Sequence, residues 1–212
     1  MSELVNPNRF AAYNEATKDV GPNQLMLDAL RYMPPGTPQY ALDLGMGNGR
    51  DTLYLHNLGF NVVGVDPEPY KVDQLPAGIQ VVNQDGLEYV MAHPKRLTYG
   101  LVNAQWVFPF MIPDLERLAV FVEQVKTLMF DKGILCGQLF GPNDFRVKKG
   151  NGEVLAMEQG DFYRVMYAEE SFKLIRFSEI EEHKAPPHKN TPQHQHYFEF
   201  IAQKQAPYKR VY

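Results

Sequence analysis

The stretch from Tyr40 to Asp66 constrains the fold of this chain more than any other part of it. Its sequence is YALDLGMGNGRDTLYLHNLGFNVVGVD. Residues 41–44 form the apolar run of a buried parallel strand, and a glycine-rich turn follows them. The helix after the turn has three apolar residues, Leu53, Leu55 and Leu58. Residues 62–65 then form a second buried strand. The stretch therefore predicts a βαβ unit with a right-handed crossover.

The acid at the end of the second strand indicates a nucleotide ligand. Asp66 follows the turn by about 20 residues, which is where such an acid accepts hydrogen bonds from ribose hydroxyls. A dinucleotide fingerprint needs a third small residue in G-x-G-x-x-G/A, and Arg50 occupies that position here. This difference disfavours NAD.

The turn has the pattern D-x-G-x-G-x-G, formed by Asp43, Gly45, Gly47 and Gly49. This pattern resembles motif I of class I S-adenosylmethionine-dependent methyltransferases, and the resemblance runs from Tyr40 to about Phe140. It implies a Rossmann-like, doubly wound α/β fold with a mostly parallel seven-stranded sheet and an antiparallel C-terminal strand. It also implies S-adenosylmethionine as the cofactor.

The resemblance assigns roles to residues at several strand ends. It places the glycine turn under the methionine moiety, Asp66 on the ribose, and Asp85 and Gly86 near the adenine. It places Ala104 to Trp106 at the edge of the methyl-transfer site. The cofactor-binding candidates are therefore Asp43, Gly45, Gly47, Gly49, Asp66, Asp85, Gly86 and Ala104.

The rest of the chain is consistent with one domain over residues 1–212. Residues 1–36 form a lid and helix region, with a helix over 24–33, and Asp114 is an N-cap. Three prolines after Asp66 leave at most residues 70–75 for the next helix. Residues 141–164 look irregular, and 141–165 are a candidate substrate cap. Residues 172–180 and 195–202 are expected to form an antiparallel pair joined by the loop 184–193.

The residues after the fourth strand bear on the methyl acceptor. Gln105-Trp106-Val107-Phe108 differs from the Asn/Asp-Pro-Pro-aromatic motif of nucleic-acid amino methyltransferases. The segment GNGRDTLYL most resembles small-molecule methyltransferases of the tellurite-resistance and thiopurine kind. No general base is evident, and a soft nucleophile such as a thiolate needs none. The substrate-side candidates are Tyr13, Trp106 and His196.

Composition and charge indicate which classes of binding partner are disfavoured. A net charge of −4 over 212 residues argues against nucleic acid, and no apolar run is long enough for a membrane span. The single cysteine and a first segment without an apolar core predict a cytoplasmic protein. His183, His188, His194 and His196 gather in one segment, and a surface or cleft histidine pair is favoured over a metal site. The sequence leaves the oligomeric state open.

Three alternatives to a small-molecule methyltransferase stay open. The first is a protein or nucleic-acid methyltransferase, which needs a wide, charged groove. The second is a non-catalytic protein that binds S-adenosylmethionine. The third is an NAD-dependent oxidoreductase, against which Arg50 is the evidence.

Overall fold

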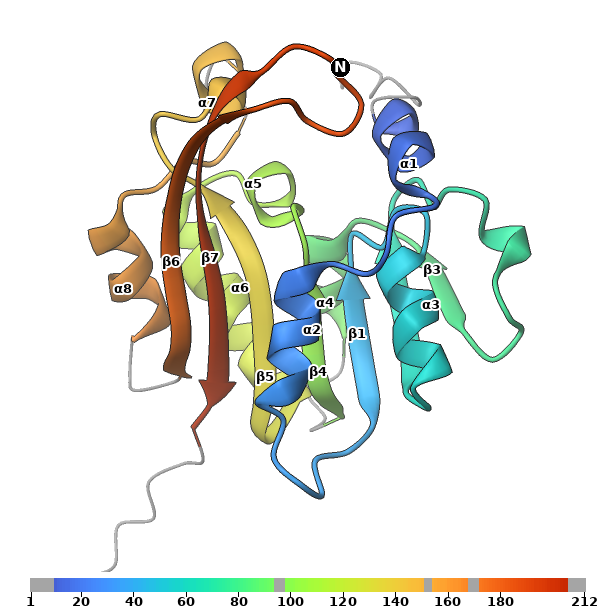
Figure 1. Ribbon diagram of the computed structural model, residues 1–212. Coiled ribbons are helices and arrows are strands. Elements are labelled where there is room, and N and C mark those ends of the chain that lie inside the picture. The colour runs from blue at the N-terminus through green and yellow to red at the C-terminus, as the bar shows by residue number, and fades with distance from the viewer. Residues whose placement is uncertain (1–9, 94–97, 151–153, 168–171, 206–212) are drawn as a thin grey trace, which may run out of the picture.

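A seven-stranded sheet forms the centre of the protein, in a computed structural model that describes residues 10–93, 98–150, 154–167 and 172–205 (Figure 1). The strand order is β3-β2-β1-β4-β5-β7-β6. The strands are β1 (Tyr40–Leu44), β2 (Asn61–Asp66), β3 (Gln80–Asn83), β4 (Tyr99–Ala104), β5 (Met129–Phe140), β6 (Phe172–Lys184) and β7 (Gln193–Lys204). β1 to β5 pair in parallel, whereas β7 is antiparallel to both β5 and β6. The predicted fold class is confirmed.

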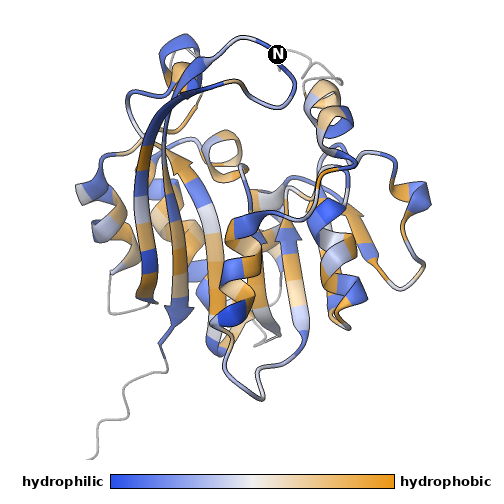
Figure 2. Ribbon diagram, viewed as in Figure 1, coloured by the Kyte–Doolittle hydropathy of each residue, from blue (hydrophilic) through white to orange (hydrophobic). Residues whose placement is uncertain are grey.

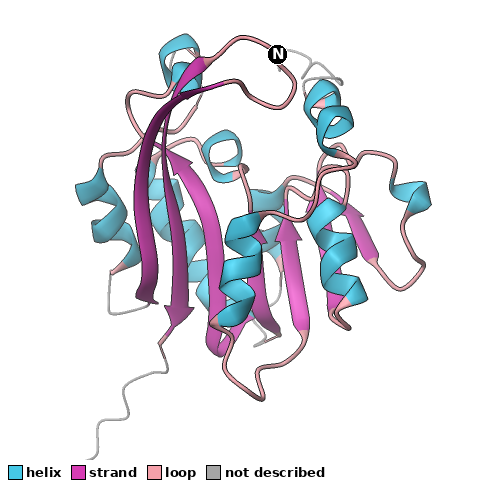
Figure 3. Ribbon diagram, in the orientation of Figure 1, coloured by secondary structure: helices cyan, strands magenta, loops and turns pink. Residues whose placement is uncertain are grey.

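Helices cover both faces of the sheet (Figure 3). On one face lie α2 (Gln24–Arg31) and α3 (Arg50–Asn57), packed on a core cluster that includes Ala41 and Ile134. On the other face lie α4 (Gly86–Ala92), α5 (Phe108–Met111), α6 (Leu115–Leu128) and α8 (Gln159–Met166). Figure 2 shows hydrophobic residues concentrated in the strands between these two layers. The central parallel strands β1 and β4 are therefore buried on both sides, as strands inside a parallel sheet usually are.

Polar side chains cap α2 and α6, and the cap at Asp114 is the one that the sequence predicts. The Asn23 side chain accepts a hydrogen bond from the Leu25 N–H at the start of α2, and Asp114 accepts one from the Arg117 N–H at the start of α6. After Asp66 the structure has only the short 3₁₀ helix η1 (Val72–Gln74) before β3. The prolines of this segment thus limit it to one turn, as predicted.

The buried face of α3 differs from the prediction. Leu55 is fully buried, but Leu53 and Leu58 are 36% and 47% exposed. Asp51 and Thr52 are buried instead, because they lie one helical turn before Leu55 on the face that meets the sheet. The helix therefore brings polar groups, and not only leucines, to the carboxyl edge of the strands.

The segment after β5 is more regular than the sequence predicts. It contains α7 (Phe145–Lys149) and α8, while residues 151–153 lie outside the described residues. Phe162 of α8 is fully buried, with its ring centroid 4.7 Å from that of Phe177 and 5.2 Å from that of Phe200. The irregular conformation predicted here is wrong for α7 and α8, because buried aromatic contacts fix α8 on the sheet. The α8 part of the segment belongs to the core.

The last two strands are longer than predicted. β7 pairs with β5 only as far as Tyr197, opposite Phe140. Beyond that point Glu181–Lys184 pair with Gln193–His196 alone. These strand ends and the loop between them, residues 181–196, form an arm above the sheet. Figure 1 shows this arm curving over the carboxyl edge toward α1 (Ala11–Thr17). The arm and α1 thus lie above the strand ends where the sequence predicts the site.

Candidate active site

The turn between β1 and α3 has three glycines in left-handed conformations. The φ angles are 70° at Gly45, 53° at Gly47 and 73° at Gly49. At Gly47 a Cβ atom would lie 2.7 Å from Oδ1 of Asn14 in α1. A side chain here is disfavoured both by the backbone conformation and by this close approach. The turn and α1 are therefore in direct contact.

Asp66 ends β2 with its carboxylate against the glycine turn. Its Oδ2 accepts a hydrogen bond from the Gly47 N–H at 2.9 Å, and its Oδ1 accepts one from the Glu68 N–H at 2.8 Å. Burial raises the pKa of Asp66, and these two hydrogen bonds oppose the rise. The carboxylate is held between the turn and the loop that follows β2.

Asp43 lies below the turn and is 2% exposed. Its Oδ2 accepts a hydrogen bond from Oγ1 of Thr52 at 2.5 Å, and its Oδ1 accepts one from Nδ2 of Asn103 at 2.8 Å. Burial raises the pKa of Asp43 to about 7, the nearby Asp51 carboxylate adds to the rise, and the two hydrogen bonds oppose it. This acid connects β1, α3 and β4 at the carboxyl edge.

Arg50 and Asp51 begin α3 as an ion pair. Nε of Arg50 lies 2.9 Å from Oδ1 of Asp51, which also accepts a hydrogen bond from the Asn23 N–H at 2.9 Å. The Arg50 side chain is only 18% exposed. It therefore lies along the site and does not extend into solvent.

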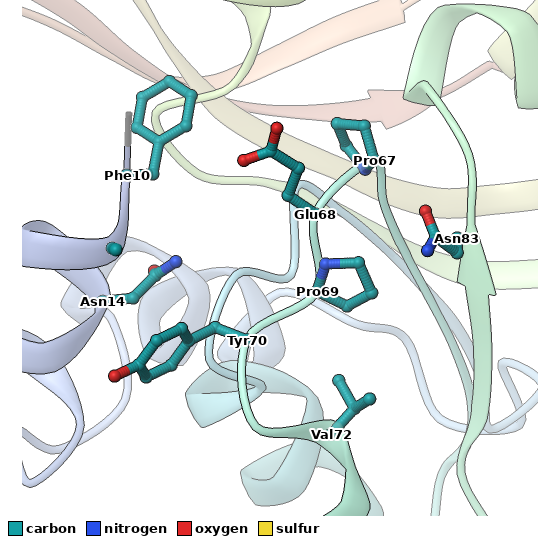
Figure 4. Close-up of a pocket in the computed structure, with 9 residues that line it drawn as sticks. Phe10, Asn14, Pro67, Glu68, Pro69, Tyr70, Val72 and Asn83 are labelled. Carbon is teal, nitrogen blue, oxygen red and sulfur yellow. The ribbon is translucent and has the colours of Figure 1, made fainter. Parts of the chain in front are cut away.

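Two cavities lie beside the carboxyl ends of the strands. The smaller, of about 50 Å³, is lined by Tyr13, Asn14, Thr17, Asp43, Gly45, Met46, Gly47, Asn48, Arg50, Asp51, Gln105 and Trp106. The larger, of about 420 Å³, is lined by Phe10, Ala11, Asn14, Pro67, Glu68, Pro69, Tyr70, Val72 and Asn83 (Figure 4). Asn14 lines both, so the two cavities lie on either side of this residue.

Helix α1 lies over the site as a lid. Nδ2 of Asn48 donates a hydrogen bond to the Asn14 carbonyl at 2.8 Å. On the other side, the Glu15 carboxylate accepts a hydrogen bond from the Tyr70 hydroxyl at 2.7 Å and lies 2.9 Å from Nζ of Lys71. Contacts of Asn14 and Glu15 thus fix α1 to the glycine turn and to the loop after β2.

Tyr13 connects this lid with the arm. Its ring centroid lies 5.9 Å from that of His188, in an edge-to-face arrangement. Burial raises the pKa of Tyr13, and it also lowers the pKa of His188. The hydroxyl therefore stays protonated at neutral pH.

Asp85 and Gly86 follow β3, and Ala104 ends β4, but none of the three lines either cavity. Oδ1 of Asp85 accepts hydrogen bonds from the Leu87 and Glu88 N–H groups at 2.8 and 3.1 Å, so this acid caps α4. Ala104 is fully buried at the end of β4, directly before Gln105. The direct contacts of Asp85 are with its own helix.

Trp106 lines the smaller cavity in a strained conformation. Its φ angle is 59°, which non-glycine residues rarely adopt, and its N–H donates a hydrogen bond to Oε1 of Gln138 at 3.0 Å. Its indole lies 4.8 Å from the Tyr197 ring and 5.2 Å from the Arg146 guanidinium. The chain thus fixes the orientation of this indole from several sides.

The structure does not bring His196 to either cavity. The side chain is buried, its Nδ1 accepts a hydrogen bond from the Asn143 N–H at 3.2 Å, and its Nε2 lies 2.9 Å from Oε1 of Glu179. Because Nδ1 accepts, the proton is on Nε2, which donates to Glu179. His196 therefore fixes the loop after β5.

Comparisons with known proteins agree with this geometry. The family model described as tellurite resistance protein TehB matches residues 15–117. TehB from Haemophilus influenzae is 16% identical, with a TM-score of 0.62 over 92% of this chain and 67% of that chain. A methyltransferase from Methanosarcina mazei that depends on S-adenosylmethionine is 15% identical, with a TM-score of 0.61 over 88% of this chain and 99% of that chain. A 1,6-didemethyltoxoflavin-N1-methyltransferase from Burkholderia thailandensis is 16% identical, with a TM-score of 0.59 over 97% and 93%. No match is found among curated proteins.

The family model covers just under half of the chain, and the fold is that of class I S-adenosylmethionine-dependent methyltransferases. Solved neighbours with this fold hold S-adenosylhomocysteine. Within the described ranges, no three His, Cys, Asp or Glu side chains are grouped so that they hold a metal ion. None of the helices in the described part of the chain is long and apolar enough to span a membrane.

The sequence did not indicate several of the residues that line the site. They are Phe10, Asn14, Thr17, Asn48, Asp51, Glu68 and Asn83. The sequence predicts a lid in residues 1–36 and indicates Tyr13 within it, but which other residues of this region line the site depends on how the chain folds back. Asp51 follows Arg50 directly, and its acidic side chain at the first turn of α3 was the available signal.

Proposed function

We propose that this protein is a methyltransferase that transfers the methyl group of S-adenosylmethionine to a small-molecule nucleophile by in-line displacement. The observation that carries the proposal is the shared cavity of Gly45, after β1, and Trp106, after β4. These two strands are adjacent, and the chain order reverses between them. Open α/β sheets bind their ligands at such a switch point.

The site residues fit the cofactor part by part. We assign the ribose to Asp66, because its carboxylate lies beside the N–H of Gly47. We assign the methionine moiety to the smaller cavity, where Asp43 and Arg50 supply one acidic and one basic group. The glycine turn and the start of α3 favour the carboxylate of that moiety.

We assign the adenine to the larger cavity. Pro67, Pro69 and Val72 offer it apolar surface, and Figure 4 shows Asn83 on the β3 side of this cavity and Phe10 on the α1 side. Asp85 and Gly86 support the same side of the site by starting α4. Asp85 would act here by fixing the strand end.

The acceptor side is enclosed, which supports a small molecule. Tyr13 of the lid and His188 of the arm are in contact above the cavity that Trp106 lines. Two neighbours have names that specify small molecules, 1,6-didemethyltoxoflavin and magnesium protoporphyrin IX. S-adenosylmethionine supplies a methyl group on a positively charged sulfur, so the chain needs mainly to orient the acceptor and exclude water. Tyr13 is a poor base, because its pKa is raised, so the acceptor should arrive as a nucleophile that needs none.

Calorimetric titration with S-adenosylhomocysteine tests the cofactor site. The wild-type protein should bind S-adenosylhomocysteine with micromolar affinity and should not bind NAD. Asp66→Ala should weaken this binding by about 10- to 100-fold, since hydrogen bonds to a charged group contribute about 1.5–3 kcal/mol. Asp73→Ala is the matched control, because Asp73 is exposed on η1 and lines neither cavity.

Circular dichroism should show that Asp66→Ala is folded before its affinity is interpreted, and Asp66→Asn provides a variant of the same size. Equal affinity of wild-type protein and both Asp66 variants would rule out the ribose assignment. Once binding is established, thiol, amine and hydroxyl compounds are screened for methylation. Methylation of a protein or nucleic acid, with no small molecule accepted, would contradict the proposed substrate class.

A further inference from the structure

We propose that the side-chain carbonyl of Gln105 binds the α-ammonium group of the cofactor's methionine moiety. This inference rests on the proposed function, because it assumes that the methionine moiety occupies the smaller cavity. It starts from Oε1 of Gln105, the side-chain acceptor of a residue that lines that cavity. Among the described residues this atom is buried and has no hydrogen-bond partner.

Neighbouring hydrogen bonds fix the orientation of the Gln105 amide. Both Asp43 oxygens accept hydrogen bonds, one from Thr52 and one from Nδ2 of Asn103. Asn103 therefore presents its NH₂ group to Asp43 and its Oδ1 to Gln105. Nε2 of Gln105 donates to this Oδ1 at 2.7 Å and lies 3.6 Å from Sγ of Cys136. A flipped amide would place two carbonyl oxygens against each other, so Oε1 is the atom left without a partner.

A buried carbonyl without a donor is unfavourable, and native structures rarely retain one without a reason. Gln105 lines the smaller cavity together with Gly47, which contacts the Asp66 carboxylate. A ligand that donates a hydrogen bond inside this cavity would satisfy Oε1. The unpaired atom is therefore evidence for a donor on the ligand.

The charges around the cavity favour an ammonium group as that donor. Asp43 from β1 and Asp51 from α3 both line it, and Asn103 connects Gln105 to Asp43. The cation that lines it, Arg50, is already paired with Asp51. An ammonium group carries three donors and a positive charge, so it can bind Oε1 and be stabilised by the acidic side. The opposite end of the same moiety, a carboxylate, suits Arg50 and the first turn of α3.

Two ligands and one substitution test this contact by calorimetry. The ligands are S-adenosylhomocysteine and its deaminated analogue, in which hydrogen replaces the α-ammonium group. Gln105→Met keeps a similar size and an unbranched shape but removes the carbonyl. We expect Gln105→Met to weaken S-adenosylhomocysteine binding by about 10- to 100-fold. The deaminated analogue should bind wild-type protein and Gln105→Met with affinities that agree within about threefold.

Gln195→Met is the matched control. Gln195 is also buried, but its amide accepts a hydrogen bond from Arg146 of α7 and donates one to the Lys184 carbonyl. It should leave the preference for S-adenosylhomocysteine over the analogue unchanged. Gln105→Glu is a second variant in case Gln105→Met does not fold, since it keeps an acceptor oxygen. It should retain the preference.

The outcomes separate this inference from the proposed function. If the wild-type protein binds neither ligand, both proposals fail. If it binds S-adenosylhomocysteine but Gln105→Met keeps the full preference for the ammonium group, only the Gln105 contact is overturned. A loss of acceptor binding with unchanged S-adenosylhomocysteine affinity would also overturn it, because Oε1 would then serve the acceptor.

Discussion

Replacing Gly45 by alanine tests how closely the glycine turn is packed against the segment after β4. The φ angle of Gly45 is 70°, a region in which alanine costs about 1–2 kcal/mol. A Cβ atom would also lie 2.6 Å from Cγ2 and 2.7 Å from Cβ of Val107. Such overpacking costs about 1–3 kcal/mol more. We expect Gly45→Ala to lower the free energy of unfolding by about 2–5 kcal/mol.

Gly36→Ala is the control, because Gly36 has a φ angle of 81° and no atom within 4 Å of its Cβ position. It should cost only the backbone component, about 1–2 kcal/mol. Urea unfolding followed by circular dichroism measures both values. The double variant Gly45→Ala/Val107→Ala should recover part of the difference, because it removes the closest methyl group. Equal destabilisation by Gly45→Ala and Gly36→Ala would refute the packing argument.

Two further predictions concern ligand binding. Burial raises the pKa of Asp43 to about 7, and its carboxylate favours the cofactor's ammonium group. The affinity for S-adenosylhomocysteine should therefore rise with pH up to about 7 and then level off. Calorimetry should show that Asp43→Asn removes this pH dependence. A wild-type affinity that does not change with pH would contradict the role of Asp43. Trp106 is the single tryptophan of the chain and lines the smaller cavity, so S-adenosylhomocysteine should change the intrinsic fluorescence. Unchanged fluorescence under saturating ligand would place the ligand away from Trp106.

Local sequence patterns were sufficient for the central part of the fold. The βαβ unit from Tyr40 to Asp66 depends on short-range features, namely apolar runs of strand length and glycines that permit positive φ. The N-cap at Asp114 and the short segment after Asp66 follow from single residues and their immediate neighbours. These features lie within about one helical turn of the residues that cause them, so no distant part of the chain alters them.

Patterns of apolar residues were less reliable where distant segments share a surface. Leu53 and Leu58 are exposed because the face of α3 that meets the sheet contains Asp51 and Thr52. α8 forms where the sequence looks irregular because Phe162 is buried against β6 and β7. Contacts between aromatic residues from distant segments leave no periodic pattern in the sequence, so periodicity does not predict them.

The sequence by itself determined the βαβ unit, the class of nucleotide expected at Asp66, and which strand ends are followed by candidate site residues. Only the tertiary structure decided which side chains meet above those strands. It placed Asn14 against Gly47, left Oε1 of Gln105 buried without a partner, and fixed His196 away from the cavity. The physical reason is that each of these contacts joins segments far apart in the chain. Their geometry therefore depends on how the lid and the sheet pack, and not on local conformational preference.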